Sequence, residues 1–415
     1  MKNRILMAFL AAIAPLFVFA QGGTSSPYSQ YGLGVMSDRS QGLSRGMNGA
    51  SLGVRKGNII NTQNPASYSA VDSLTMLIDA GVSGQITNYK ENNTKVSQKS
   101  ANFEYFVGSF RMLRHVGLSV GVLPYSAIGY SYETKSATNT YISNDGDGGF
   151  REAFLGIGWQ MFPGLSVGAN VGYLWGGFDR SVISAESTSL ASLSRIYSTE
   201  VSSYLADFGI QWQQPLSRTD YITVGATFGL GHKLGADATC VVSNVTMMLS
   251  DSMTVSNAYS VPMSYGLGVA YNHDDRLLVD ADFLLRRWGS LDYPAISDNG
   301  DYAMQGGLLK DSYHFRAGLD YVPNDRTSRK YYNHIHYRLG AGYSTSYFYV
   351  NGKEGPKELS VSIGLGLPLL NNRSMVNISG QWCRTSATGM ISENTFRINL
   401  GLTFNERWFA KWKID

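Results

Sequence analysis

Charged side chains at alternating positions are the residues of this sequence best placed to do chemistry. His334 and His336 are two residues apart and Arg338 follows, and residues two apart on a strand share one face. Two imidazoles on one face are able to bind a metal ion, but no acidic or cysteine ligand lies near them in the sequence. We therefore expect a polar lining here and no metal site.

Other motifs of catalysis and cofactor binding are missing from the sequence. There is no GxSxG, HExxH or P-loop pattern, and the GxG pairs lack the third glycine and helix of a dinucleotide site. Residues Asp145–Gly149 resemble the start of a calcium loop without its later glutamate, so we expect an extracellular loop tip. Cys240 and Cys383 are far apart and form no CxxC pair. The sequence thus predicts no catalytic residues, no cofactor and no enzyme.

The segments that must position these charges alternate between apolar and small or polar residues. The pattern is clearest over Leu165–Trp175, Ile222–Leu230, Leu359–Leu367 and Phe396–Phe404. A period of two indicates β-strands with one apolar and one polar face. Runs of about 10 to 14 residues are long for globular strands and match tilted membrane strands. The pattern predicts an all-β fold, an antiparallel transmembrane β-barrel.

The polar face of these strands carries the predicted lumen lining. A charge that faced lipid at mid-depth would cost about 2–4 kcal/mol, so inward placement is favoured. Alternation also places many glycines on this side, which suits a lumen in which a plug packs closely. The lining residues expected from this pattern are Asp79, Asp207, Asp280, Asp282, Arg286, Arg316, Asp320, His334, His336 and Arg338.

Fourteen alternating segments can be counted over residues 73–405, an even number as expected for an up-and-down barrel with periplasmic termini. One of them is a single strand over 220–242. The longer connections at 135–149, 185–196, 243–258 and 289–310 all follow odd-numbered strands and should face outward. Residues 21–72 alternate little and are predicted to form an N-terminal plug or lid. Residues 406–415 are predicted to be an interfacial tail rich in Trp and Lys.

The N-terminus and the composition agree with export to an outer membrane. Lys2 and Arg4 precede an apolar run from Ile5 to Phe19 and a small residue, Ala20, which predicts a signal peptide over residues 1–20. The chain has 26 Tyr, 7 Trp and 46 Gly but only 16% charged residues, which suits membrane strands with aromatic residues at the interfaces. The net charge of +3 is scattered and predicts no nucleic-acid partner.

The segment before the first strand is similar to a known family. Asn64-Pro65-Ala66, after the small-residue run Ser44–Ala50, resembles the NPA-containing segment of the FadL/TodX family of outer-membrane proteins. The resemblance implies an N-terminal plug that gates the barrel at Asn64, Pro65 and Ala66, and contact with outer-membrane lipid. It also implies passive uptake of hydrophobic molecules such as long-chain fatty acids.

A second hypothesis follows from the polar lumen and from other members of the same family. The lumen positions are Gly, Ser, Asp, Arg and His instead of a continuous apolar track. Some FadL-like barrels are non-conducting subunits of larger outer-membrane machines for secretion or assembly, whose partners are other outer-membrane proteins. An apolar pocket joining the outer loops to the plug would favour uptake, and a lumen filled with paired charges and side chains, without a lateral gap, would favour the subunit.

Overall fold

The computed structural model describes residues 23–408 except positions 92, 136–139, 187–191, 245–248, 298, 324–327 and 370–373. The predicted signal peptide and residues 409–415 of the predicted tail lie outside the described residues. None of the helices in the described ranges is both long and apolar enough to span a bilayer.

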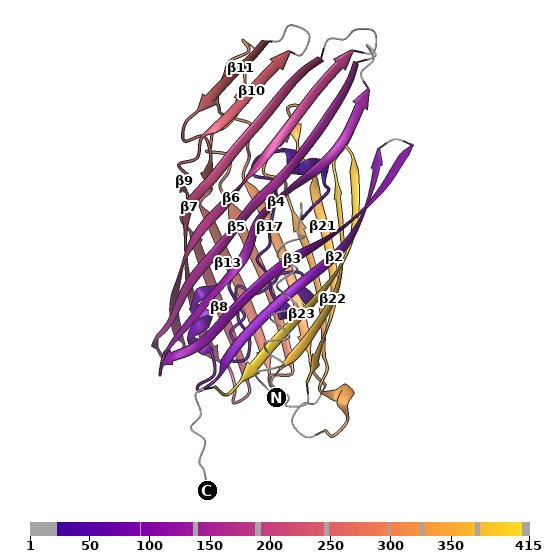
Figure 1. Cartoon of the computed structure of the whole chain (residues 1–415). Coiled ribbons are helices and arrows are strands. Elements are labelled where there is room, and N and C mark those ends of the chain that lie inside the picture. Colours follow the sequence, from indigo (N-terminus) through magenta and orange to yellow (C-terminus); the bar gives the residue numbers. More distant parts are fainter. Residues whose placement is uncertain are drawn as a thin grey trace.

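The fold is a closed antiparallel β-barrel of fourteen strands, as predicted (Figure 1). Each barrel strand pairs with the next, and the first, β2, also pairs with the last, β23. The barrel strands are β2 (Met76–Glu91), β3 (Thr94–Leu113), β4 (Val116–Lys135), β5 (Thr140–Phe162), β6 (Leu165–Glu186), β7 (Ser192–Pro215), β8 (Asp220–Gly229), β13 (Ser264–His273), β14 (Leu277–Arg286), β17 (Ser312–Tyr321), β18 (His336–Ser344), β21 (Lys357–Pro368), β22 (Met375–Ser386) and β23 (Ser392–Glu406).

Shorter elements lie inside the barrel or at its ends. The remaining strands are β1 (Val35–Met36), β9 (His232–Lys233), β10 (Ala238–Asn244), β11 (Leu249–Val255), β12 (Ser260–Val261), β15 (Tyr293–Ile296), β16 (Tyr302–Gln305), β19 (Tyr349–Val350) and β20 (Lys353–Glu354). The helical turns are η2 (Pro27–Gln30), α2 (Gly42–Gly46), η3 (Pro65–Ala70) and η4 (Tyr331–Asn333).

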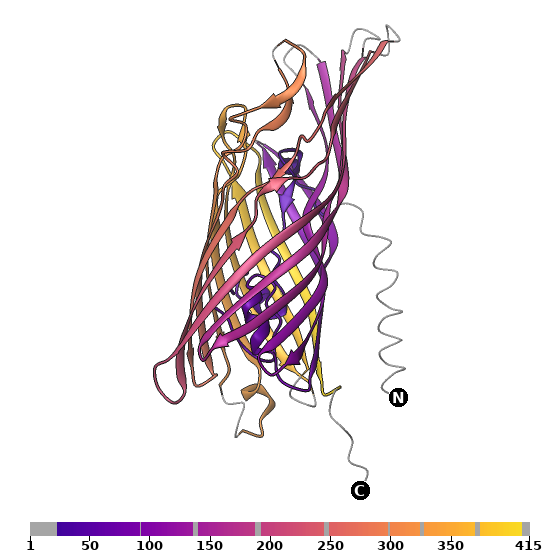
Figure 2. The same cartoon turned by 90° about the vertical axis from the view of Figure 1, so that its left-hand side faces the viewer.

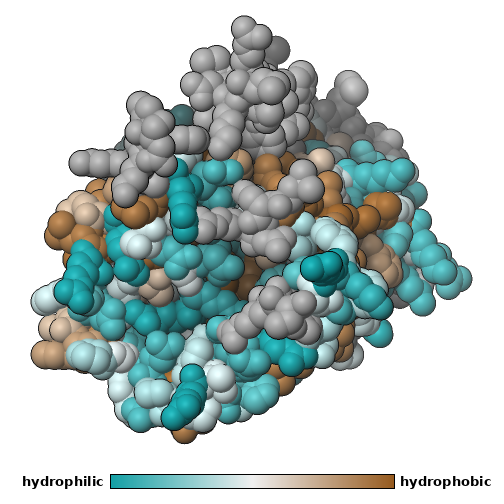
Figure 3. All heavy atoms as spheres, turned by 90° about the horizontal axis from the view of Figure 1, so that it is seen from below, coloured by the Kyte–Doolittle hydropathy of each residue, from teal (hydrophilic) through white to brown (hydrophobic). Residues whose placement is uncertain are grey.

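Alternation along each strand produces the two surfaces of the wall. Large apolar side chains such as Val171 and Ile363 are each 62% exposed on the outside, whereas polar residues such as Ser166 and Asn170 are buried inside. Lipid in contact with the outer surface would cover the apolar side chains. Seen from below, the central part of the barrel end is largely hydrophilic (Figure 3).

One side of the barrel is much taller than the other. Strands β4 to β7 have 20 to 24 residues each, whereas β8, β13, β14 and β17 have ten. The hairpin β10–β11 continues this tall sheet, because β10 pairs with the outer part of β7. We call β10, β11 and the outer parts of β4 to β7 the wing; it stands at the top of Figure 1.

Two expectations about this region were wrong. The strand expected over 220–242 is divided, because β8 ends at Gly229 and the chain resumes as β10 at Ala238, paired with a different part of β7. Asp145–Gly149 is no loop tip but part of β5, paired with both β4 and β6. Backbone pairing with the two neighbouring strands holds Asp145–Gly149 in an extended conformation, although this stretch lacks apolar alternation.

Strands β3 and β4 separate in the outer half of the wall. Their pairing ends at Phe106 and Val122, although β3 continues along β2 and β4 continues along β5. Inside this separation, β1 pairs with β4 through Val35–Ala127 and Met36–Ser126.

The luminal segment, residues 23–72, runs inside the barrel from this separation to the periplasmic end. At its start, the Asn102 side chain of β3 donates to the Gly23 carbonyl at 2.6 Å, and Ser29 bonds to Gly129 of β4. At its far end, η3 packs against β4, β5, β6 and β7. Figure 2 shows this segment, in indigo, enclosed by the strands.

Candidate functional site

The NPA motif connects the luminal segment to the wall at the periplasmic end. The Asn64 side chain caps η3 by accepting from the Ala66 amide at 3.2 Å and donates to the Leu52 carbonyl at 2.9 Å. It also donates to the Ile210 carbonyl of β7 at 3.3 Å. One amide thus joins three parts of the chain, and both its donor and its acceptor are used.

Glycines of the wall make room for this close contact. A Cβ on Gly168 would lie 2.4 Å from the Pro65 carbonyl carbon, and one on Gly117 would lie 1.9 Å from the Tyr68 carbonyl oxygen. Further along, one on Gly340 would lie 2.3 Å from the Met47 carbonyl carbon. Contacts this short are impossible for a side chain. These lumen-facing glycines therefore allow the luminal segment to contact the wall closely, and no bound ligand is needed to explain them.

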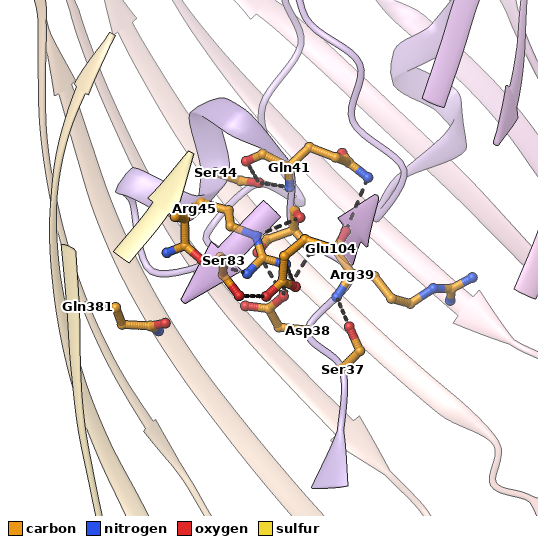
Figure 4. A network of polar contacts seen from close by, with 12 residues as sticks. Ser37, Asp38, Arg39, Gln41, Ser44, Arg45, Ser83, Glu104 and Gln381 are labelled. Atoms are coloured by element: carbon orange, nitrogen blue, oxygen red, sulfur yellow. Dashed lines mark hydrogen bonds and ion pairs between the residues drawn. The ribbon is translucent and has the colours of Figure 1, made fainter. Parts of the chain in front are cut away.

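Arg45 of α2 joins the luminal segment to the opposite wall (Figure 4). Its guanidinium lies 2.6 Å from Glu104 of β3 and 3.7 Å from Asp38, and it also donates to Asn399 of β23 at 3.2 Å. Ser83 donates to the same Glu104 carboxylate. Both Arg45 and Glu104 are buried, so the pair is screened little by water.

Asp38 is held ionised by the same network. Burial opposes its ionisation, but the charges of Arg45 and Arg316 and hydrogen bonds from Ser40 outweigh burial. The pKa of Asp38 therefore lies below its usual value.

Arg39 makes a second crossing of the lumen. Its guanidinium binds Glu152 of β5 at 2.5 Å and Asp207 of β7 at 2.8 Å. The Glu152 side chain is only 1% exposed. A buried carboxylate that stays ionised is stabilised by a nearby cation, so Arg39 ties the segment to two strands.

Asp320 is the centre of a third group. Its carboxylate lies 3.1 Å from Arg338 Nε, 3.0 Å from His336 Nδ1 and 3.6 Å from Lys56 Nζ of the luminal segment. Arg338 also donates to Asn377 at 2.6 Å and to the Gly42 carbonyl at 3.5 Å. A wall carboxylate and a wall cation together hold the segment here.

The other predicted acidic residues also face the luminal segment. Asp282 accepts from the Ser51 and Leu52 amides at 2.6 and 2.9 Å. A Cβ on Gly53 would lie 2.8 Å from Asp280 Oδ1, and one on Gly42 would lie 3.4 Å from Asp79 Oδ2. The predicted inward charges therefore lie around the segment and do not form one catalytic group.

His334 is placed differently from the expectation that it shares a strand face with His336. It follows η4, in the turn before β18, and its Nε2 lies 2.8 Å from the Ser328 carbonyl oxygen. The chain is not yet extended at this position, so alternation does not apply. Within the described ranges, no group of three or more His, Cys, Asp or Glu side chains is arranged to hold a metal ion.

The alternation pattern did not lead us to list Glu104 and Glu152, the wall carboxylates that form ion pairs with Arg45 and Arg39. Glu104 is the extra residue of a β-bulge in β3, because Gly81 pairs with Tyr105 and Val82 pairs with Phe103. A bulge redirects a side chain, so the alternation rule fails there. Glu152 does obey the rule. It is three residues from Leu155, whose side chain faces outward, so alternation along β5 places the Glu152 side chain inside the barrel.

A cavity of about 600 Å³ lies on the outer side of the network. The part of its wall on β14 and β17 carries Arg286, His314 and Arg316, and the opposite part reaches Phe103 and Ala127 at the separation of β3 and β4. Above it, apolar and aromatic side chains from the outer connections form a buried cluster that includes Trp288 stacked on Tyr347 at 4.5 Å. The cavity thus lies between an aromatic cap and the luminal segment.

Comparison with known proteins identifies the family. All of residues 1–415 match the family model described as BamG. The chain belongs to the BamG family. No curated protein matches the sequence.

Solved structures of bacterial transporters and of a FadL homologue share the fold of this BamG-family chain. The toluene transporter TodX of Pseudomonas putida aligns with a TM-score of 0.65 at 16% identity, over 91% of this chain and 100% of that chain. The toluene transporter TbuX of Ralstonia pickettii gives 0.61 at 14% identity, over 88% and 97%. A FadL homologue of Pseudomonas aeruginosa gives 0.61 at 11% identity, over 89% and 99%.

The predicted FadL/TodX resemblance is therefore confirmed for the fold. This BamG-family chain has the fourteen-stranded barrel fold of the FadL-type proteins. TodX and TbuX are toluene transporters, and that role is stated of those two proteins.

Proposed function

We propose that this chain is a closed, non-conducting barrel that serves as a subunit of a larger outer-membrane complex. The observation that carries the proposal is the ion-pair network, in which Arg39 and Arg45 bind Glu152, Asp207 and Glu104 across the lumen. Opening a path would separate buried charges, at a cost of about 3–5 kcal/mol for each broken pair. A luminal segment held in this way stabilises the barrel and resists displacement by a solute.

The wing supports a role in binding other proteins. Among the described strands, β11 pairs only with β10, and its other edge, which lies near β16, forms no strand pairing. An open strand edge is a template for pairing with another chain, and edges are usually blocked by Pro, Lys or a bulge. Residues Leu249–Val255 contain none of these.

Purification from native outer membranes in mild detergent tests the proposal. We expect a protein partner in fixed stoichiometry with the chain, identified by mass spectrometry, and no acyl ligand in the barrel. A chain that is recovered alone and loaded with an acyl ligand would contradict the proposal.

A FadL-type channel for hydrophobic molecules such as fatty acids is the second candidate. The separation of β3 and β4 beside the cavity favours it, because a hydrophobic solute could leave sideways there. Uptake of a labelled long-chain fatty acid by cells, with and without replacement of Asn64-Pro65-Ala66 by three glycines, tests this candidate. Uptake that depends on the chain and changes with the replacement would favour the channel.

A further inference from the structure

Two guanidiniums and an imidazole gather on one part of the cavity wall. Strands β14 and β17 pair with Arg286 opposite Ser312, Leu284 opposite His314 and Asp282 opposite Arg316. Arg286, His314 and Arg316 all line the large cavity, and they also line a neighbouring cavity of about 90 Å³. Two adjacent strands thus present two guanidiniums and an imidazole to the same space.

Unlike Arg39, Arg45 and Arg338, the two arginines make no ion pair with a carboxylate among the described residues. Within the part of the chain that the structure describes, no carboxylate lies within 4.0 Å of either Arg286 or Arg316. Arg316 donates only to neutral oxygens, the Gly49 carbonyl at 3.3 Å and Gln63 Oε1 at 3.5 Å. The Ser312 hydroxyl lies 3.5 Å from His314 Nε2.

The nearby carboxylates are engaged elsewhere or stand apart. Asp207 is bound to Arg39, Asp38 lies 3.7 Å from Arg45, and Asp282 accepts two backbone amides. Glu358 also lines the large cavity, and among the described residues no ion pair joins it to Arg286 or Arg316, although the charge of Arg316 acts on it. Partly buried guanidiniums without counter-ions are costly, and the cost falls when an anion binds.

We propose that Arg286, His314 and Arg316 form a binding site for a phosphate group. A phosphate monoester carries a charge of about −1.5 to −2 at neutral pH, which matches the two guanidiniums. Arginine binds phosphate through paired, charge-assisted hydrogen bonds, and the imidazole adds one N–H donor in its neutral form. The inference does not depend on whether the barrel conducts solutes.

The surroundings of the site admit two sources of the phosphate. A lipid-linked phosphate could extend its chain toward Phe103, Pro124 and Ala127, where the cavity meets the separation of β3 and β4. A soluble phosphate ester would need only the space between the cap and the luminal segment. Both sources present the same phosphate oxygens to the two arginines.

Calorimetric titration of the purified full chain in detergent tests the site. The probes are inorganic phosphate, octyl phosphate and octanoate. The Arg286→Gln/Arg316→Gln variant should bind phosphate about tenfold or more weakly, because it loses charge-assisted hydrogen bonds. The matched control Arg287→Gln/Lys310→Gln removes two charges outside the cavity lining and should bind as the wild type does.

The relative affinities of the three probes distinguish the possible ligands. Binding of inorganic phosphate as tight as that of octyl phosphate would indicate a soluble ester, and binding of octyl phosphate alone would indicate a lipid. Octanoate bound as tightly as octyl phosphate would overturn the assignment to phosphate, and equal binding by the double variant and the control would overturn the site. If the double variant does not fold, as judged by heat-modifiable mobility, Arg286→Gln alone replaces it, because no partner of Arg286 is described.

Discussion

Three basic side chains of the luminal segment form ion pairs with carboxylates of the wall. Arg39, Arg45 and Lys56 of the segment meet Glu152, Glu104 and Asp320 of the wall. A partnered charge inside a barrel is stabilising only as long as its partner remains, because each alone has been removed from water. Replacing one partner of such a pair therefore leaves the other charge buried and unpaired.

Removing the Arg39 charge should destabilise the barrel strongly. Arg39→Met keeps most of the side-chain volume but leaves the Glu152 carboxylate buried and unpaired, which costs about 3–5 kcal/mol. Urea unfolding in lipid vesicles, followed by tryptophan fluorescence, measures the free energy of unfolding. Lys310→Met, which breaks the exposed pair with Glu354, is the control and should leave it unchanged. A similar effect of both variants would contradict the role of Arg39.

A methyl group at Gly168 should loosen η3. Gly168→Ala forces its Cβ against Pro65, and overpacking of this kind costs about 1–3 kcal/mol. We expect faster trypsin cleavage after Arg55 or Lys56 in the intact barrel. Gly84→Ala, whose Cβ would meet nothing within 4 Å, is the matched control. Equal cleavage of the two variants would argue against the seating of the segment on Gly168.

Acid should weaken the hold of the luminal segment through Asp38. Its pKa is lowered on folding, so its stabilisation is complete above its ordinary value of 3.8 and is lost as the pH falls through the lower folded value. We expect denaturant stability to fall less between pH 5 and 3 in Asp38→Asn than in the wild type. Parallel losses in the two proteins would show that other groups govern the acid response.

The barrel strands differ mainly in what they pair with beyond the membrane. β3 and β4 part above Phe106 and Val122, and the short strand β1 takes the free edge of β4. β7 exchanges β8 for β10 along its length. Each exchange uses backbone hydrogen bonds that the alternation of side chains does not specify.

The pairing of β1 with β4 can be tested by a disulfide. Val35→Cys and Ala127→Cys place two thiols on directly paired residues, whose Cα separation is within disulfide range. In a background with Cys240→Ser and Cys383→Ser, we expect oxidation to join them within the folded barrel, seen as a mobility shift that a reductant reverses. The pair Val35→Cys and Ser143→Cys serves as the negative control, since Ser143 pairs with Glu133 and Ile183 instead. Crosslinking of the control but not of the test pair would place β1 elsewhere.

At the scale of the whole molecule, the barrel is divided into a closed membrane part and a tall, one-sided wing. The aromatic cap covers the cavity, and the luminal segment closes the barrel below it. This shape is consistent with the proposed role as a subunit of a larger complex.

Removing the β10–β11 hairpin should weaken partner binding while the barrel still folds. Ala258 donates to the Ala236 carbonyl at 2.9 Å at the base of the hairpin, so a short Asn-Gly turn can replace residues 238–255. We expect normal heat-modifiable mobility, because the membrane part of β7 keeps its pairing with β8. Co-purification of the partner should fall. A shortened chain that retains its full complement of partner would exclude the hairpin as the contact.

The sequence by itself determined the membrane wall. Strands of period two must separate lipid from lumen, so the alternation was sufficient for the fourteen strands and for the inward direction of Asp207, Asp282, Arg316 and Arg338. Only the tertiary structure decided which charges meet. Glu104 turns inward because of a bulge, Asp145–Gly149 is extended because both neighbouring strands pair with it, and Arg39 finds Glu152 across the lumen. Alternation is a local property, whereas these contacts join residues far apart in the chain, which only closure of the barrel around residues 23–72 brings together.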